Sequence, residues 1–167
     1  MLRELHKELG IDASYGQETG LQPFAEADEL VEVGPNLVGH MQRLTPAAAD
    51  RWAAMVEAAA GHGIQLLIVS GFRGFEYQAA LIRKKIAGGQ QIADILAVNT
   101  APGFSEHHTG NAVDIATPGS RPLTEDFENT QAFQWLTENA GEFGFSMTYP
   151  KDNPWGITYE PWHWSLK

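Results

Sequence analysis

The chain has 167 residues, of which 43% are hydrophobic and 19% charged, so its composition is that of one folded globular domain and excludes a disordered chain. Its net charge of -10 disfavours nucleic acids and anionic lipid surfaces as partners. Because it contains no cysteine, it can form no disulfide, and any metal must be held by histidines and carboxylates. We expect a monomer without a transmembrane segment.

The first half of the chain predicts two helices and two strands. A short helix over residues 2–9 ends at Gly10, and residues 30–33 form a strand. Thr45 as N-cap and Pro46 at the first helical position begin the second helix. Trp52, Met55, Val56 and Ala59 form the core face of this helix. The apolar run over residues 65–71 predicts a buried strand.

The second half predicts two more helices and three strands. Helices are expected over residues 76–87 and 130–140, and late strands within 144–150 and 160–166. Residues 111–117 alternate as a strand that directs Val113 and Ile115 into the core and Asp114 away from it. The pattern predicts a single compact α+β domain, with a mainly antiparallel central sheet flanked by helices. We expect an N-terminal extension over residues 1–27 and a catalytic domain over 28–167.

Three of the six histidines have simple structural explanations. His6 lies in a charged terminal helix, His40 in a polar segment, and His62 at a helix end where a cation interacts with the last carbonyl groups. We do not expect these three to take part in chemistry.

The segment SEHHTGNAVDI is a candidate metal-binding segment. A histidine pair precedes a glycine-bearing turn, and Asp114 follows on the next strand. An imidazole and a carboxylate are two of the three protein ligands of an open zinc site. Adjacent residues of an extended chain point in opposite directions, so only one of His107 and His108 can face the metal, and spacing alone leaves either open.

The segment YEPWHW supplies a further histidine and a carboxylate. His163 follows Glu160 by three residues, and Pro161 between them favours an extended path. Two histidines and one aspartate leave the fourth zinc position for water, and Glu160 is then a candidate general base. The competing interpretation is a polar loop and an aromatic core strand with a hydrogen-bonded histidine.

Three segments in order resemble the signature of the VanY-type D-alanyl-D-alanine carboxypeptidases, a family that includes L,D-carboxypeptidases and is related to VanX dipeptidases. The family pattern Ser-x-His-x-x-Gly-x-Ala-x-Asp is met by Ser105, His107, Gly110, Ala112 and Asp114. The segments SGFRGFEYQ and EPWHW match the other two patterns, and the similarity spans roughly residues 28–164.

The resemblance implies a role for each matched residue. It makes His107, Asp114 and His163 the ligands of one zinc ion per chain, and Glu160 the catalytic base. It implies that Arg73 stabilises the developing oxyanion. It also implies that Gln78 and Ser105 contact the substrate's terminal carboxylate. The implied substrates are peptidoglycan stem peptides or muropeptides.

Two departures from the family pattern concern substrate preference. Thr148 stands where the family usually has arginine, and Ser165 lies where the last motif commonly continues into an Arg-Tyr pair. The alternatives to a carboxypeptidase are an L-alanyl-D-glutamate endopeptidase, a D-Ala-D-Ala dipeptidase and a non-catalytic cell-wall module. The sequence leaves open D,D- against L,D-specificity. It also leaves open the compartment, because the substrate indicates the cell envelope while no signal peptide is recognised.

Overall fold

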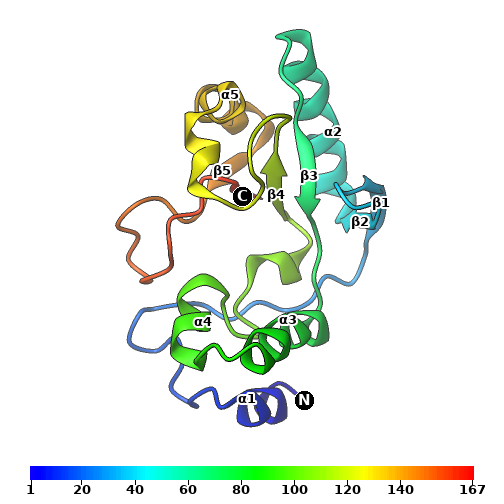
Figure 1. Cartoon of the computed structure of the whole chain (residues 1–167). Coiled ribbons are helices and arrows are strands. Elements are labelled where there is room, and N and C mark those ends of the chain that lie inside the picture. Colours follow the sequence, from blue (N-terminus) through cyan, green and yellow to red (C-terminus); the bar gives the residue numbers. More distant parts are fainter.

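A four-stranded antiparallel sheet forms the centre of the molecule in the computed structural model, which describes residues 1–167 (Figure 1). The strand order is β3-β4-β6-β5. The strands are β3 (Leu67–Ser70), β4 (Ala112–Ala116), β5 (Phe145–Met147) and β6 (His163–Leu166). Helix α2 (Pro46–Gly61) begins as predicted, with the Thr45 hydroxyl accepting a hydrogen bond from the Ala48 amide.

The main core lies between the sheet and the helices α2 and α5 (Gln131–Asn139). Trp52 and Met55 from α2 share this core with Trp135 and Leu136 from α5. Val113 and Ile115 of β4 are fully buried in the same cluster, as their alternation predicted. Two 3-10 helices, η2 (Glu125–Asn129) and η3 (Ala140–Phe143), flank α5.

A second, smaller core belongs to three helices that lie below the sheet in Figure 1. These are α1 (Leu2–Leu9), α3 (Phe75–Ala87) and α4 (Ile92–Val98). The core consists of Leu5, Leu9, Ile11, Ala79, Ile82, Ile95 and Ala101. The 3-10 helix η1 (Glu106–Thr109) connects this helical core to strand β4.

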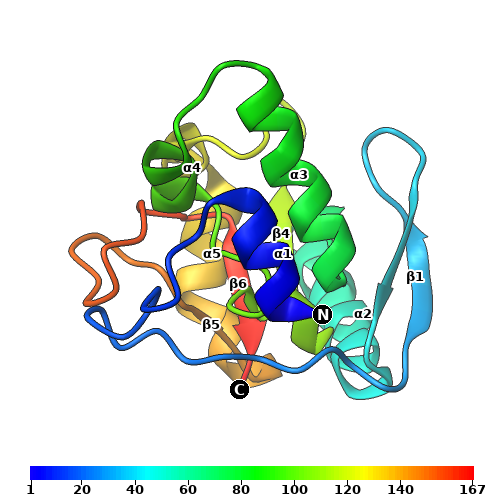
Figure 2. The same ribbon diagram turned by 90° about the horizontal axis from the view of Figure 1, so that it is seen from below.

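The N-terminal segment packs on the rest of the chain. Helix α1 lies against α3, and the segment after it runs along the molecule to a hairpin of β1 (Val31–Pro35) and β2 (Met41–Leu44) (Figure 2). The Phe24 amide donates to the Gly103 carbonyl, and the Ala27 amide donates to the His108 carbonyl. The division of the chain at residue 28 remains a prediction.

The structure confirms the α+β class and the antiparallel sheet. All the predicted helices and strands are present, within a few residues at their ends. Helix α4 and strand β2 were not predicted. None of the helices has the length and the apolar character needed to cross a membrane.

Candidate active site

Strands β4 and β6 place Asp114 and His163 side by side. The two residues are cross-strand partners in the antiparallel register of this pair. The turn of η1 returns His107 to the same point, and Gly110 ends that turn in the left-handed conformation with φ of 69°. Residues that are 49 positions apart in sequence are thereby brought into contact through the sheet.

The three side chains form a compact buried donor set. His107 Nε2 lies 3.1 Å and His163 Nδ1 lies 3.0 Å from the same oxygen, Oδ1 of Asp114. The three ligand atoms all lie within 4.8 Å of one another. Two imidazoles and one carboxylate are the donor set of an open catalytic zinc site, so these residues could hold that metal.

The orientation of His107 is set by the backbone. Its Nδ1 lies 2.7 Å from the Gly71 carbonyl oxygen, to which a protonated Nδ1 donates, so that Nε2 is left with a free lone pair. Position 71 itself favours glycine, because a Cβ atom there would lie 2.7 Å from the carbonyl oxygen of Arg43.

His108 points away from the donor set. Its Nδ1 lies 2.6 Å from the Arg73 carbonyl oxygen, and its Nε2 accepts a hydrogen bond of 3.0 Å from the Gly103 amide. Both ring nitrogens are thus engaged by the backbone, and the ring packs edge-on against Phe75. Of the two adjacent histidines, only His107 lies in the donor set, a distinction that spacing alone leaves open.

The electrostatics of the three donors suit a cation. Although burial raises the pKa of Asp114, the two imidazoles outweigh it and hold that pKa well below its usual range. Burial and the neighbouring Arg73 lower the pKa of His107 to about 4, so this ring is neutral. Burial also opposes the charge of His163, but the carboxylates of Asp114 and Glu106 raise its pKa to about 10. A metal ion that binds there must displace the proton of His163.

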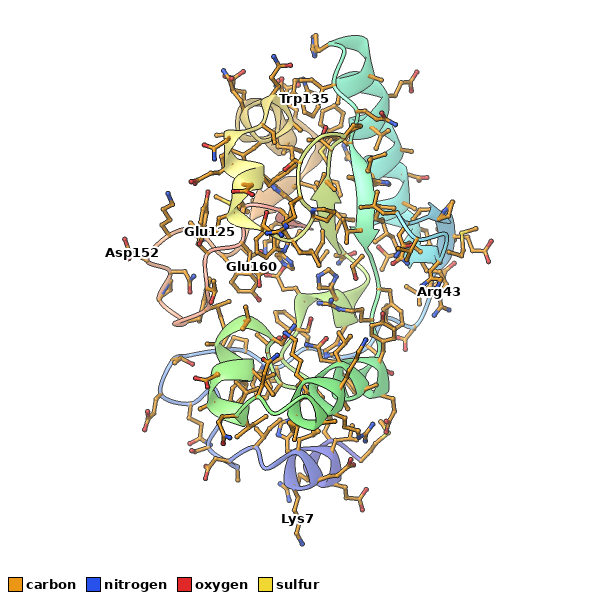
Figure 3. All side chains as sticks on the ribbon, in the orientation of Figure 1. Lys7, Arg43, Glu125, Trp135, Asp152 and Glu160 are labelled. Atoms are coloured by element: carbon orange, nitrogen blue, oxygen red, sulfur yellow. The ribbon has the colours of Figure 1, made fainter.

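Glu160 lies beside this group, between the sheet and helix α4 (Figure 3). Its Oε2 is 3.7 Å from His163 Nδ1, and only 13% of its side chain is exposed. Burial raises the pKa of Glu160 to about 7, against the attraction of His163. A carboxyl group with a pKa near neutrality can both accept and return a proton.

A cavity of about 190 Å³ opens onto the donor set and Glu160. Arg73, Gln78 and Ser105 also line it, so all seven residues singled out in the sequence border one space. Gln78 donates from Nε2 to the Thr100 carbonyl, while its buried Oε1 has no partner. Ser105 accepts a 3.2 Å hydrogen bond from the His107 amide, and Arg73 has a buried Nε without a partner.

The family model VanY, described as D-alanyl-D-alanine carboxypeptidase, matches residues 41–166. The chain belongs to the VanY family. It is similar to the Bacillus subtilis protein YodJ, with 37% identity over 122 residues that cover 70% of this chain and 43% of YodJ. The chain spans less than half the length of three curated relatives that it matches.

Two solved structures resemble this VanY-family chain. The LdcB LD-carboxypeptidase has a TM-score of 0.75 and 29% identity, covering 84% of this chain and 69% of LdcB. A mutant of the D,D-pentapeptidase VanY from a VanB-type resistance cassette, in complex with Zn(II), has a TM-score of 0.65 and 28% identity. That match covers 87% of this chain and 80% of VanY.

One polar group behind the site was missed in the sequence. The buried carboxylate of Glu106 lies 3.2 Å from Lys167 Nζ, and its Oε2 lies 3.9 Å from His163 Nε2. The second distance is that of an ion pair and not of a hydrogen bond, so this nitrogen has no hydrogen-bond partner. Lys167 Nζ also lies 3.3 Å from the hydroxyl of Thr148, the residue that replaces the arginine of the VanY pattern.

Two other histidines of this VanY-family chain make structural contacts. His62 Nδ1 accepts a 2.8 Å hydrogen bond from Trp135 Nε1, and the residue stands at the C-terminal end of α2. His6 Nε2 lies 2.7 Å from the Pro102 carbonyl oxygen. Neither ring faces the active-site cavity, whose lining includes only His107 and His163 among the histidines.

Proposed function

We propose that this chain is a zinc-dependent carboxypeptidase that removes a C-terminal D-alanine from peptidoglycan stem peptides. The observation that carries the proposal is the buried set of His107, Asp114 and His163 with Glu160 beside it. Membership in the VanY family supports the substrate class, and the Zn(II) complex of the VanY relative supports the metal. We propose one zinc ion per chain.

The side chains around the donor set divide the work of hydrolysis. Zinc at this site supplies a Lewis acid and lowers the pKa of a water molecule to about 7. Glu160 accepts the proton of the attacking water and returns it to the leaving amine. Arg73, whose buried Nε has no partner in the structure, stabilises the negative charge that develops on the scissile carbonyl oxygen.

Gln78 and Ser105 are the proposed contacts of the substrate's terminal carboxylate. Gln78 is 1% exposed and keeps one amide hydrogen beyond the one that it gives to Thr100. Ser105 has a hydroxyl hydrogen to donate, because its oxygen acts as acceptor towards the His107 amide. Two neutral donors on one wall of the cavity suit a free carboxylate and favour an exopeptidase over an endopeptidase.

The test uses defined tetrapeptide and pentapeptide stem peptides, each with a free or an amidated C-terminal D-alanine. Incubation with the zinc-loaded protein should release one alanine from a free-acid peptide, as measured by mass spectrometry. Amidation leaves polar groups of the site poorly paired and should reduce cleavage by about tenfold or more. The Gln78→Ala variant should reduce the difference in cleavage between the free and the amidated peptides, because it should slow cleavage of the free-acid peptide only.

The products also discriminate between the alternatives. Loss of alanine from the pentapeptide indicates D,D-specificity, and loss from the tetrapeptide indicates L,D-specificity, the two activities named for VanY and LdcB. Release of D-Ala-D-Ala would indicate a dipeptidase, and internal cleavage of amidated and free peptides alike an endopeptidase. No cleavage of any peptide would leave the non-catalytic module.

A further inference from the structure

A second cavity adjoins the active-site cavity on the side of the β1–β2 hairpin. It has a volume of about 490 Å³ and is lined by residues of the hairpin, β3 and α3. Four residues line both cavities, namely Arg73, Lys85, Asn99 and Leu123. The two cavities therefore adjoin each other at these four side chains.

The charge of this second cavity is opposite to that of the chain. Its lining contains Arg43, Arg73 and Lys85 and no aspartate or glutamate, although the whole chain has a net charge of -10. The arginine and lysine side chains that form ion pairs in the structure are Arg83, Lys151 and Lys167. The cations of the second cavity are thus free to attract an anion.

Arg43 and Lys85 are fixed by neutral groups. The Arg43 guanidinium lies 5.5 Å from the ring centre of Phe72, and Figure 3 shows Arg43 at the hairpin, across the molecule from Glu160. Lys85 Nζ donates to Oδ1 of Asn99, and its side chain is half-buried. Neither contact neutralises the positive charge.

Lys85 is on the same wall as the proposed carboxylate contact Gln78. The two residues are seven positions apart on α3, which puts them on one face of the helix and about 10 Å apart along its axis. An extended peptide spans about 10 Å in three residues. The separation fits a substrate whose end lies at Gln78 and whose anionic group is within three residues of that end.

Large exposed apolar side chains border the same hollow. Met41 is 50%, Tyr77 is 58% and Leu123 is 48% exposed, and all three line the second cavity. Exposed apolar groups of this size beside a cavity are typical of a surface that binds a ligand. They suit the methylene groups of a peptide that carries long side chains.

We propose that the second cavity binds the part of the substrate on the N-terminal side of the scissile bond and that Lys85 recognises a carboxylate on it. This inference rests on the proposed function. Stem peptides carry such a carboxylate at the γ-linked D-glutamate and, where it is present, at diaminopimelate. The shared chemistry is a carboxylate, and the experiment distinguishes its two sources.

The experiment measures binding of three peptides to the zinc-loaded Glu160→Gln variant by calorimetry. All three end in the same D-alanine. One has both carboxylates free, one has the D-glutamyl carboxylate amidated, and one has lysine in place of diaminopimelate. Loss of the recognised carboxylate should weaken binding by about fivefold, the upper range for a partly exposed ion pair.

Variants of neighbouring lysines provide the controls. Adding Lys85→Met should make binding of the free and the modified peptides equal, whereas Lys85→Arg should keep the preference. Lys84→Met is the matched control, because Lys84 is exposed on the same helix and lines neither cavity. With Lys84→Met added, the Glu160→Gln variant should bind all three peptides as it does without this change.

Each outcome decides the inference. If all three peptides bind the parent equally, if none binds, or if the preference persists in Lys85→Met, Lys85 is not a carboxylate contact. A preference that Lys85→Met abolishes supports the inference even if the unmodified protein releases no alanine, in which case only the proposed function fails. If the unmodified protein releases alanine but the three peptides bind equally, the inference about Lys85 fails and the proposed function stands.

Discussion

Two adjacent histidines differ in which of their ring nitrogens remain free. His107 is anchored at Nδ1 and directs Nε2 toward Asp114, whereas the backbone engages both nitrogens of His108. The two side chains are almost equally buried, at 2% and 0% exposed, so burial does not distinguish them. The assignment of the zinc ligand therefore depends on hydrogen bonding and can be tested by substitution.

We predict that His107→Ala loses bound zinc and that His108→Ala retains it. The His108→Ala protein should still lose about 1–3 kcal/mol of unfolding free energy, because the Gly103 amide is left without its acceptor. Elemental analysis after dialysis gives the zinc content, and urea denaturation gives the free energy. Zinc retained by His107→Ala and lost by His108→Ala would reverse the assignment.

Glu160 should destabilise the metal-free protein at high pH. Burial raises the pKa of Glu160 from 4.5 to about 7, so the folded state holds a proton that the unfolded state has released between these values. The stabilisation by the protonated carboxyl group is present below pH 4.5 and is lost as the pH rises to 7. The loss amounts to about 3 kcal/mol of unfolding free energy.

The Glu160→Gln variant removes this titration and keeps the shape of a protonated carboxyl group. We predict that, without metal, it is about as stable as the parent protein near pH 4.5 and about 3 kcal/mol more stable at pH 8. Urea denaturation of both proteins across this range measures the difference. A difference that does not change with pH would mean that Glu160 is not buried as the structure shows.

With zinc, the same variant should lose about a hundredfold or more in turnover.

At the scale of helices and strands, the segments with local signals were predictable. The Thr45-Pro46 pair predicted the start of α2, and the alternation around Asp114 predicted both the strand and the direction of its side chains. Helix α4 has seven residues and no side-chain cap, and it is held by the burial of Ile95 in the second core. Strand β2 has no β-branched residue and depends on pairing with β1. Contacts of this kind are not visible in a local pattern.

The candidate site shows the same division. Its ligands lie in motifs of fixed spacing, so a resemblance could select them, and the structure brings them together in one cavity. Glu106 and Lys167 are 61 residues apart and meet only because β6 pairs with β4. No sequence pattern connects the two residues.

We predict that Lys167 helps to hold His163 in place through Glu106. The Lys167→Met variant removes the lysine partner of the buried carboxylate and should weaken zinc affinity by about tenfold, the lower range for groups behind a metal ligand, because Lys167 is 52% exposed. Thr148 lies beside Lys167, so adding Thr148→Arg should supply the missing charge and restore the affinity. Competition with a chromophoric chelator measures both effects.

The control for this pair of variants is Lys151→Met. Lys151 pairs with Glu128 on the surface and contacts none of the candidate ligands, so zinc affinity should stay the same. An unchanged affinity in Lys167→Met, or a loss that Thr148→Arg does not repair, would contradict the positioning role. Zinc affinity is the informative measurement here, because a general loss of stability would not be repaired by moving the charge.

At the scale of the whole molecule, the candidate site lies between two separate hydrophobic cores. Asp114 and His163 come from strands that border the main core, whereas Gln78 comes from α3, which packs with α1 and α4 in the second core. His107 is in η1, which lies between α3 and the central sheet (Figure 1). The metal donors and the proposed carboxylate contact thus depend on different packing.

This arrangement predicts different effects of large-to-small substitutions in the two cores. Leu9→Ala removes a side chain that is 4% exposed in the second core, and Ile115→Ala removes one that is fully buried next to Asp114. Each should cost about 2–5 kcal/mol of unfolding free energy. We expect Leu9→Ala to raise KM for a free-acid peptide while zinc affinity stays the same, because it loosens the packing of α3 and leaves the strands in place. Ile115→Ala should weaken zinc affinity, because it shifts β4.

Chelator competition and steady-state kinetics below the unfolding transition compare the two variants. Equal losses of zinc affinity would mean that the two cores support the site as one unit.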